Sequence, residues 1–589
     1  MFKAISINDY KKIKSFLNLE FNSKYIASEL QFQNIFAWKE VDNLLIHFSD
    51  NYAVLKGKNN LDFFFPPLAE CEKSFLEGLN FIENYCSTNS IPVLFHSIPE
   101  IYLHLFEKYK LFSQRNFFEY IHYTKDLIEL KGKRYHAKRN HIAQFLKNYS
   151  YEFLPYKEDF RKDIENLIDF WNKKHEDNHE KEAIFNILDN LEALECYCDC
   201  IFIDNYLCGF AIGFISNNVG IILFEKANTT CTGIYSFLEN LFIKKNFSNT
   251  LYINRQEDMG IASLRKSKLS LHPEFLEKKY LAVQPLKEQL YNLYSLGFPE
   301  DSLSYKKFFF EAKIKNLKYK LLKKKNIVLS MFFFKEQTLS ILNTDFKTKF
   351  ISTLTTHPIY QKKHLATKLI CSSLNLFSKN TDFVVLHPTN EDFYKKFGFI
   401  TYSKKSSINF NSFERFETNN VNELKEFYDL TLKNFDVYTK RSEKDFKFWY
   451  LEILSDQGKV YKLKSNNKSL GYAVCFDNQI EEFCLTIQEN STFSNMIRIC
   501  NVISILQNYP YKNDFSFSLK INDKIIHKNN ITIKISHENG LTNISKSIFY
   551  DFEVSIETLT ELLILGKTSN NIPISKYFQT LKTISLDKY

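Results

Sequence analysis

The chain is poor in the residues that break regular structure. Only 14 of its 589 residues are Gly and 12 are Pro, whereas Phe (58) and Tyr (34) are abundant. This bias, together with many Lys, Asn and Ile, is typical of an AT-rich genome, so we do not take aromatic clusters as evidence of function. The eleven Cys have no disulfide-framework spacing, which is typical of a reducing cytoplasm.

Long apolar runs are also missing. No run approaches the roughly 18 residues that would indicate a membrane span. The start, Met-Phe-Lys-Ala-Ile-Ser, lacks a basic stretch followed by a long apolar core, which argues against a secretory signal. We therefore expect a cytoplasmic protein with no membrane span.

Charge of either sign is only mildly unbalanced. Lys and Arg (77) exceed Asp and Glu (68), for a net charge of +9. The excess is spread out apart from Lys313–Lys325, which favours a solvated helix face running into a strand. Modest attraction to an anionic partner such as CoA or RNA stays open. Nothing indicates a DNA-binding domain.

One cysteine cluster invites a metal hypothesis. Cys196, Cys198 and Cys200 alternate in a strand-like stretch, so their side chains share one face. A zinc site needs convergent ligands, usually two pairs at turn spacing, and no second Cys or His pair follows suitably. We expect small core residues here and no metal.

The order of helical and strand patterns divides a chain too long for one core. Helix, meandering strands, helix and strand recur, which is the order of an acyltransferase fold on a mixed sheet. The predicted class is α/β (α+β), with tandem folds of this kind and a small α+β domain at the end. The expected segments are 1–125, 126–295, 296–410, a degraded copy at 411–505, and 506–589.

The stretch from Ile351 to Ile370 carries the clearest chemistry. We expect hairpin strands Val328–Phe334 and Thr338–Leu342, then strand Phe350–Thr356, a basic loop and helix Thr367–Phe377. A loop entering a helix offers unpaired backbone N–H groups and the positive end of the helix dipole, which suits a pyrophosphate. Lys362 and Lys363 add charge. Most such joints bind nothing, so this pattern alone is weak.

A second stretch strengthens the hypothesis. Predicted strand Phe383–Leu386 runs into His387-Pro-Thr-Asn-Glu-Asp-Phe-Tyr-Lys-Lys-Phe-Gly-Phe399. This resembles the closing element of GNAT acetyltransferases, in which an Asn and then a Tyr precede a Gly-Phe turn. The resemblance implies that Tyr394 protonates the departing CoA thiolate, and a phenol with a pKa of about 10 holds its proton at neutral pH. The alternative is a packed aromatic side chain.

The loop departs from that family at one position. GNAT pyrophosphate loops usually have Arg/Gln-x-x-Gly-x-Gly/Ala. Gln361, Leu365 and Ala366 fit, but His364 occupies the central Gly position. If that position requires a positive φ or a close backbone approach, His is costly, and the cofactor would bind more weakly or the loop would be reshaped.

The half from 296 to 589 is similar to the enhanced intracellular survival (Eis) family, a GNAT domain, a degenerate GNAT domain and a sterol-carrier-like domain. The matching pieces are 355–358, 393–399, 441–449 and 556–566. The resemblance implies acetylation of amines by acetyl-CoA, with the terminal carboxylate of Tyr589 as base. It also implies a CoA-lining set: Leu354, Thr355, Thr356, Lys362, Lys363, His364, Leu365, Ala366, Thr367 and Asn390.

The half from 1 to 295 is similar to a different group. Lys131–Ile142, Phe224–Ala227 and Ile253–Lys268 resemble an uncharacterised bacterial family related to the C-terminal domain of phosphatidylglycerol lysyltransferase, a pair of GNAT-like lobes. Relatives use aminoacyl-tRNA as donor, so an anionic donor or acceptor would meet a set of basic residues. The alternative is a solvated basic helix and loop. The set comprises Lys138, Arg139, Arg255, Arg265, Lys266 and Lys268.

Three hypotheses follow. The leading one is an N-acetyltransferase in which a substrate amine attacks the thioester directly, because no Cys or Ser nucleophile constellation is visible. The second is a transferase dependent on aminoacyl-tRNA and centred on 126–295. The third is a non-catalytic binding scaffold. The acceptor (peptide, polyamine, aminoglycoside or amino acid) and the oligomeric state stay open, and an oligomer is compatible with the sequence.

Overall fold

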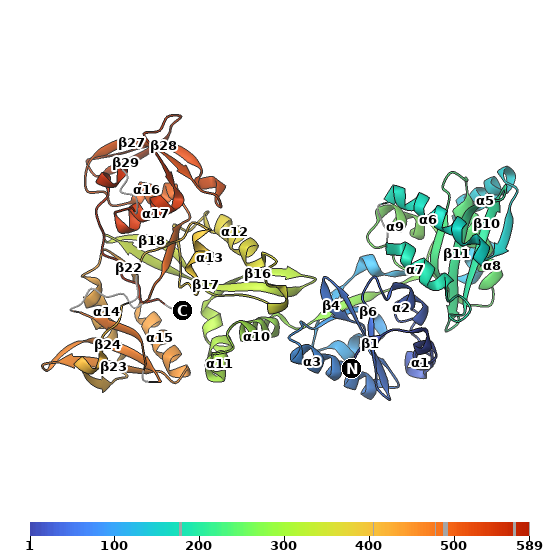
Figure 1. Ribbon diagram of the computed structural model, residues 1–589, viewed down its shortest axis with the longest axis horizontal. Helices are drawn as coiled ribbons and strands as arrows, with labels where there is room; N and C mark the ends of the chain where they lie inside the picture. The colour runs from blue at the N-terminus through green and yellow to red at the C-terminus, as the bar shows by residue number, and fades with distance from the viewer. Residues whose placement is uncertain (176–178, 404–405, 478, 487–492, 569–572, 588–589) are drawn as a thin grey trace. The chain divides into compact units, whose positions relative to one another are not determined.

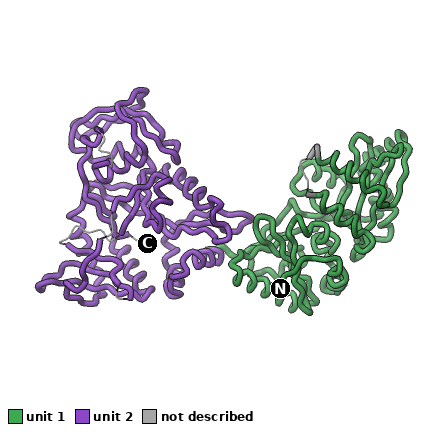
Figure 2. The backbone as a smooth tube through the Cα atoms, in the orientation of Figure 1, with its two compact units in different colours: residues 1–286 green, residues 287–589 purple. Residues whose placement is uncertain are grey.

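The computed structural model describes the whole chain except residues 176–178, 404–405, 478, 487–492, 569–572 and 588–589 (Figure 1). It divides into two compact units, Met1–Leu286 and Lys287–Tyr589 (Figure 2). The sequence predicts the corresponding boundary at 295/296. Gly297 explains why the preceding residues go with the second unit: a Cβ there would lie 2.2 Å from the Thr355 hydroxyl oxygen.

Unit 1 contains two sheets, and both mix parallel and antiparallel pairs. The first has the order β1-β2-β3-β4-β6-β15-β7, with β5 paired to β3. Its strands are β1 (Lys3–Ala4), β2 (Leu45–Phe48), β3 (Tyr52–Asn59), β4 (Leu61–Phe64), β5 (Leu68–Ala69), β6 (Leu94–Pro99), β7 (Lys110–Ser113) and β15 (Lys279–Val283). Its main helices are α1 (Tyr10–Leu17), α2 (Phe32–Trp38) and α3 (Glu72–Thr88). β15 follows the strands of the second sheet in the sequence but pairs with β6 and β7 of the first sheet. The chain therefore passes from the first lobe to the second and back.

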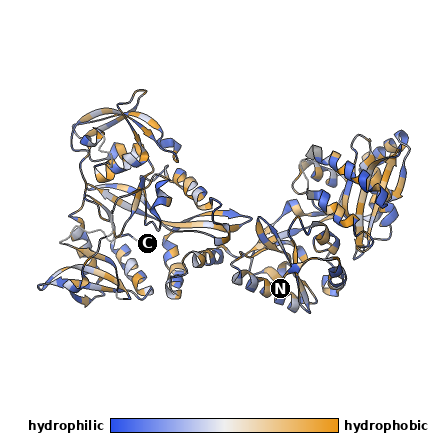
Figure 3. Cartoon of the chain, in the orientation of Figure 1, coloured by the Kyte–Doolittle hydropathy of each residue, from blue (hydrophilic) through white to orange (hydrophobic). Residues whose placement is uncertain are grey.

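The second sheet has the order β14-β8-β13-β12-β11-β10-β9. Its strands are β8 (Glu119–Tyr123), β9 (Glu152–Pro155), β10 (Cys196–Ile203), β11 (Tyr206–Ser216), β12 (Val219–Ala227), β13 (Tyr252–Asn254) and β14 (Phe275–Glu277). The accompanying helices are α4 (Thr124–Glu129), α5 (His136–Asn148), α6 (Arg161–His175), α7 (His179–Leu188), α8 (Ile234–Asn246) and α9 (Ala262–Leu269). The long strands of this sheet are largely apolar (Figure 3). Cys196, Cys198 and Cys200 are buried in β10 as free thiols.

Unit 2 is centred on a third sheet of order β16-β17-β18-β19-β26-β20, with β22 paired to β17. Its strands are β16 (Lys318–Lys324), β17 (Ile327–Ile341), β18 (Thr344–Thr356), β19 (Phe383–Leu386), β20 (Ile400–Thr401), β22 (Val437–Lys440) and β26 (Met496–Ile499). The helices along this part of the chain are α10 (Leu286–Gly297), α11 (Leu303–Glu311), α12 (Leu365–Phe377) and α13 (Glu391–Lys395). Two strands of the predicted 411–505 segment, β22 and β26, therefore complete this sheet.

Two smaller antiparallel-rich sheets finish unit 2. The fourth consists of β21 (Glu414–Glu417), β23 (Lys459–Ser465), β24 (Lys468–Phe476) and β25 (Gln479–Leu485), with helices α14 (Val421–Leu432) and α15 (Glu443–Ser455). The fifth has the order β29-β28-β27-β30, with helices α16 (Val502–Asn508) and α17 (Ile556–Leu565). Its strands are β27 (Phe515–Asn522), β28 (Ile531–Glu538), β29 (Leu541–Lys546) and β30 (Phe552–Ser555).

The α/β class with mixed sheets is confirmed, but one predicted hairpin is wrong. The sequence predicts a turn between Phe334 and Thr338, whereas β17 runs unbroken from Ile327 to Ile341. The turn falls at Leu342 and Asn343, whose φ values are 48° and 67°. Two consecutive positive φ values match the twist of a tight hairpin. The polar run at 335–337 is therefore part of a continuous strand and is no turn. No described helix is long and apolar enough to span a membrane.

Candidate active site

A splay between two parallel strands opens the third sheet. β18 and β19 pair from Thr348 and Phe383 to Ile351 and Leu386, and there the pairing ends. β18 continues to Thr356 against β17, while the chain after β19 turns into α13. The separated strands leave backbone groups of β18 available on one edge.

A bulge sits at that point of β18. The register with β17 shifts between Met331 and Phe333, and Thr353 has a φ of 52°. Its side-chain hydroxyl is buried without a hydrogen-bond partner among the described residues. A bulge places an extra residue in one strand and re-aims the groups beside it. Of the predicted CoA-lining residues, Leu354, Thr355 and Thr356 follow directly, and Thr355 is buried.

The loop between β18 and α12 has the features of an anion site. Within the part of the chain that the structure describes, the backbone N–H groups from Lys362 to Thr367 have no hydrogen-bond acceptor. They lie before and within the first turn of α12, a helix of 13 residues, where the helix dipole favours negative charge. Lys362 and Lys363 are exposed beside them. The loop can therefore hold a pyrophosphate by donors and charge together.

His364 adopts the conformation that the usual Gly would adopt. It is the N-cap of α12 in the left-handed region, with a φ of 58°. A non-Gly residue is uncommon there, although His is among the side chains that tolerate it better. The loop thus keeps its shape with His in the central position, at some cost in conformational strain. Lys362, with a φ of 60°, is also left-handed.

Tyr394 lies on α13, packed beside the core of the third sheet. Its ring makes an edge contact with Phe399 at a centroid distance of 6.0 Å. Burial raises the pKa of Tyr394 to about 12, so its hydroxyl keeps its proton at neutral pH. Asn390 caps the same helix, and its side-chain oxygen accepts from the backbone N–H of Phe393 at 3.1 Å. The predicted roles of both residues stay predictions.

A cavity of about 590 Å³ is lined in part by residues of β17. It is bounded by β17, β22, α11, α15 and the residues Leu586 and Asp587. Eight carboxylates and six cationic side chains line it, together with aromatic rings such as Phe448 and Trp449. The carboxylates belong to Asp301, Glu336, Asp445, Glu452, Asp456, Glu481, Glu482 and Asp587.

Contacts connect this cavity to the splay. Phe493 lines the cavity and contacts the His387 ring at a centroid distance of 5.4 Å. His387 directly follows β19, and its Nδ1 lies 2.8 Å from the Asn495 side-chain oxygen. Asn495 in turn donates to the Asp587 carbonyl at 2.6 Å. The residues that follow β19 therefore contact the cavity wall directly, through Phe493, and through Asn495 to Asp587.

The last described residues are fixed at the cavity wall. The side-chain carboxylate of Asp587 lies 3.1 Å from Arg441, which holds the pKa of that carboxyl below its usual value although burial opposes this. Arg441 also contacts the Leu586 carbonyl. Tyr589, the predicted base, lies outside the described residues.

Most of the basic residues predicted to meet an anion in unit 1 are engaged internally. Arg255 pairs with Glu225 at 2.8 Å and with Glu239 at 2.9 Å. Arg265 pairs with Asp258 at 2.7 Å, and Lys268 donates to two backbone carbonyl groups. Arg139 donates to the Gly132 carbonyl. Lys266 is exposed, and Lys138 is half-buried.

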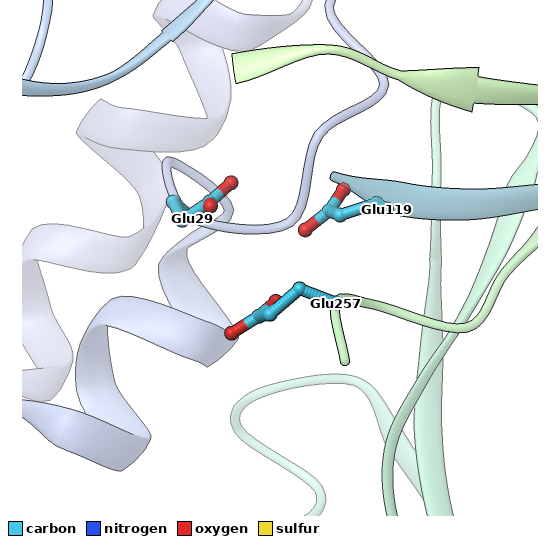
Figure 4. Close-up of side chains that lie close together, drawn as sticks. All are labelled: Glu29, Glu119 and Glu257. Atoms are coloured by element: carbon cyan, nitrogen blue, oxygen red, sulfur yellow. The ribbon is translucent and has the colours of Figure 1, made fainter. Parts of the chain in front are cut away.

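Sequence reasoning missed a cluster of three carboxylates in unit 1. Glu29, Glu119 and Glu257 bring ligand oxygens within 4.8 Å of one another (Figure 4). Burial raises the pKa of Glu29 to about 8. Lys279 occupies the place that a cation would take, because its ammonium pairs with Glu29 and lies 2.7 Å from Glu119. These residues are far apart in the sequence, so no local pattern could have found them.

Comparison with known families agrees with this architecture. Residues 23–283 match the family described as phosphatidylglycerol lysyltransferase, C-terminal. Residues 286–401 match the acetyltransferase (GNAT) domain. The class is therefore defined: the chain carries an acyltransferase domain of the GNAT type. More particularly, this domain follows a unit that resembles the C-terminal part of phosphatidylglycerol lysyltransferase.

Individual relatives are more distant. An uncharacterised protein of Mycoplasmoides gallisepticum is 29% identical over 169 residues, which are 28% of this chain and 54% of that protein. The chain thus spans about half of the length of that relative. A Bacteroides thetaiotaomicron protein of unknown function is 26% identical, covering 48% of this chain and 99% of its own, with a TM-score of 0.45. Eis1 from Mycobacterium abscessus is 10% identical, covering 51% and 96%, with a TM-score of 0.38. Since neither TM-score reaches 0.5, the class stands on the two family matches.

Proposed function

We propose that unit 2 is an N-acetyltransferase that moves an acetyl group from acetyl-CoA to an amine. The observation that carries the proposal is the loop before α12, where free backbone N–H groups from Lys362 to Thr367 stand at a helix N-terminus beside two lysines. A pyrophosphate needs both features. The left-handed His364 keeps the loop in the shape that presents them.

The residues around the splay supply the rest of the proposed site. Leu354, Thr355 and Thr356 follow the bulge in β18 and would line the thioester arm. The loop residues Leu365, Ala366 and Thr367 would contribute N–H groups to the phosphates. Asn390 would contribute its amide nitrogen, since its oxygen already caps α13.

The proposed reaction needs one acid and one base. The amine nitrogen bonds to the acyl carbon while the carbon–sulfur bond breaks. Tyr394 gives its hydroxyl proton to the departing thiolate, and its raised pKa keeps that proton in place beforehand. The proton that the amine loses goes to the terminal carboxylate of Tyr589, which with a pKa of about 3.5 is ionised at neutral pH. Asp587 supports this assignment because it fixes the chain two residues earlier at the cavity wall.

The cavity beside β17 is the proposed place of the acceptor. Asp301 and Asp456 line one part of it, and neither makes an ion pair with a cationic side chain of the described residues. Each accepts instead from a hydroxyl group, of Tyr294 and Ser302 respectively. With Trp449 and other rings nearby, this wall suits a cationic group. We propose a small-molecule or peptide amine that carries a further positive charge.

Calorimetric titration of the full chain tests the proposal. Acetyl-CoA should bind with one-to-one stoichiometry. S-acetylpantetheine carries the same thioester but lacks the pyrophosphate and the 3′-phosphoadenosine. It should bind at least roughly tenfold more weakly, since each lost 1.4 kcal/mol is tenfold in affinity. Equal binding of the two ligands, or no binding of acetyl-CoA at millimolar concentration, would contradict the proposed cofactor site.

The alternative, transfer from aminoacyl-tRNA by unit 1, has less support. The internal pairing of Arg255, Arg265 and Lys268 leaves few basic groups for a polyanion. We therefore keep tRNA binding as the second hypothesis. We also propose a cytoplasmic location, because all eleven Cys are free thiols.

A further inference from the structure

The fifth sheet displays an unusual run of apolar side chains. Ile548, Phe549 and Tyr550 connect β29 to β30, and their exposed fractions are 86%, 76% and 48%. We call these three residues the apolar tip. Exposed single apolar residues are ordinary on protein surfaces, but consecutive ones displayed together mark an interaction surface.

The tip is held outward by hydrogen bonds at both ends. The Ser547 N–H donates to the Thr532 carbonyl on β28 at 3.0 Å. The Asp551 N–H donates to the Ser518 carbonyl on β27 at 2.9 Å, and the Asp551 carboxylate accepts from the Ser518 N–H at 2.6 Å. Because the flanking residues are fixed on the two central strands of the sheet, the side chains between them are kept away from the core.

Lysines outnumber carboxylates around the tip, with Lys520, Lys534 and Lys546 against Asp551 and Glu553. Lys546 lies just before it, and Lys534 pairs in register with Ser518, the residue that anchors Asp551. Both lysines are exposed, and neither makes an ion pair with a described carboxylate. Lys520 lies over the Tyr550 ring, 5.1 Å from its centroid, although it pairs with Glu553.

We propose that the apolar tip inserts into the surface of a lipid bilayer that contains anionic phospholipids. Ile548 and Phe549 would enter the acyl boundary, Tyr550 would lie at the headgroup level, and Lys534 and Lys546 would meet the lipid phosphates. A lipid surface fits better than a protein partner, because a specific protein interface buries about 1,000 Å² or more and three residues on one loop are far too few for it.

Vesicle partitioning of the full chain tests this proposal. Sedimentation with phosphatidylcholine vesicles is compared with vesicles that contain about one-third phosphatidylglycerol. Wild type should partition into the anionic vesicles, and Ile548→Ser with Phe549→Ser should reduce the partition coefficient about tenfold or more. Leu541→Ser is the matched control, because Leu541 is 70% exposed at the other end of β29. It should change partitioning less than twofold.

Charge supplies an independent test. Lys534→Glu with Lys546→Glu should also lower the partition coefficient, and added salt should weaken wild-type binding. The proposal is overturned if wild type binds neither vesicle at low salt, or if the serine double variant binds like wild type. It is equally overturned if analytical ultracentrifugation shows that the serine variant abolishes a dimer while vesicle binding is unchanged. Thermal melting verifies that each variant is folded.

Discussion

The second and third sheets share one connection, in which a strand leads through a helix to a parallel neighbouring strand, but its surroundings differ. In one, β12 leads through α8 to the parallel strand β13, which pairs on its other edge with antiparallel β8. In the other, β18 leads through α12 to parallel β19, which pairs with antiparallel β26. The strands separate beyond the pairing in both sheets, so the comparison isolates what the loops and side chains contribute.

The loops differ in how their donors are used. Between β12 and α8, the N–H groups of Thr230, Cys231, Thr232 and Ile234 all find acceptors within unit 1. Helix α5 closes the loop, since a Cβ on Gly233 would lie 2.1 Å from the His141 carbonyl oxygen. The loop before α12 leaves its donors free and carries lysines. Among the described residues, three of the seven N–H groups from Thr230 to Ser236 lack an acceptor, whereas all six from Lys362 to Thr367 lack one.

The two splays differ as well. In unit 1, Arg255 lies between Glu225 and Glu239 and fills the opening with buried charge. In unit 2, the opening contains the bulge at Thr353, and Tyr394 is close by on α13. The proposal that unit 2 carries out acyl transfer from CoA rests on this difference between the two sheets, and four experiments test it.

The largest effect is expected from Tyr394→Phe, which removes only the hydroxyl. If this residue is the acid, turnover should fall about 10²–10⁴-fold with any amine that the wild type accepts, while acetyl-CoA affinity stays within about twofold. Since burial raises the pKa of Tyr394 to about 12, wild-type turnover should show no loss from its ionisation up to about pH 10. The exposed Tyr319→Phe on β16 is the control. Full activity of the Tyr394 variant would remove the acid assignment.

Glu225→Gln tests whether the splay of unit 1 is filled by structural charge. Burial raises the pKa of Glu225 from 4.5 to about 7. The folded carboxyl therefore holds its proton between pH 4.5 and 7 while the unfolded one loses it, so the wild type loses stability as the pH rises through this window. The Gln variant cannot ionise and should gain roughly 3 kcal/mol relative to wild type between pH 4.5 and 8.

Hydrogen exchange of the β12 amides, corrected for the intrinsic rate at each pH, measures this difference. The exposed Glu182→Gln on α7 is the matched control and should show no such dependence on pH. A constant difference between Glu225→Gln and wild type across the window would mean that the buried carboxyl is ionised throughout.

Reversal of the loop charge gives a smaller effect. Lys362→Glu with Lys363→Glu should weaken acetyl-CoA binding about tenfold or more, because two attractive charges near the phosphates become repulsive. Lys11→Glu with Lys12→Glu makes the same change of net charge at two exposed positions of α1 in unit 1 and should leave affinity within about twofold. Calorimetry that finds unchanged affinity in the loop variant would place the cofactor elsewhere.

The smallest effect is expected at His364. His364→Gly relieves the strain of a positive φ, so acetyl-CoA should bind as well as in wild type or up to about fivefold more tightly. His364→Val puts a β-branched side chain in the same conformation and should weaken binding. Calorimetry measures both affinities. If the Gly variant binds clearly more weakly, the imidazole itself contacts the cofactor.

Local patterns in the sequence determined much of the region from α12 to α13 of the third sheet. The apolar run Phe383–Leu386 forms β19 with the expected bounds, and the expected helix at 367–377 begins only two residues earlier. The stretch around Tyr394 identified the family because its residues are consecutive. Such features follow from propensity and periodicity within a few turns, which one sequence contains.

The tertiary structure alone decided the rest. The cavity beside β17 draws its wall from α11, α15 and Asp587, and the carboxylates of Glu29 and Glu119 meet from strands and loops of separate lobes. The insertion of β26 beside β19 also joins segments more than 100 residues apart. No local signal encodes such contacts, because they depend on which faces pack once the sheets have formed. Whether a loop's N–H groups are bonded or free is decided in the same way, by the neighbours that folding brings to it.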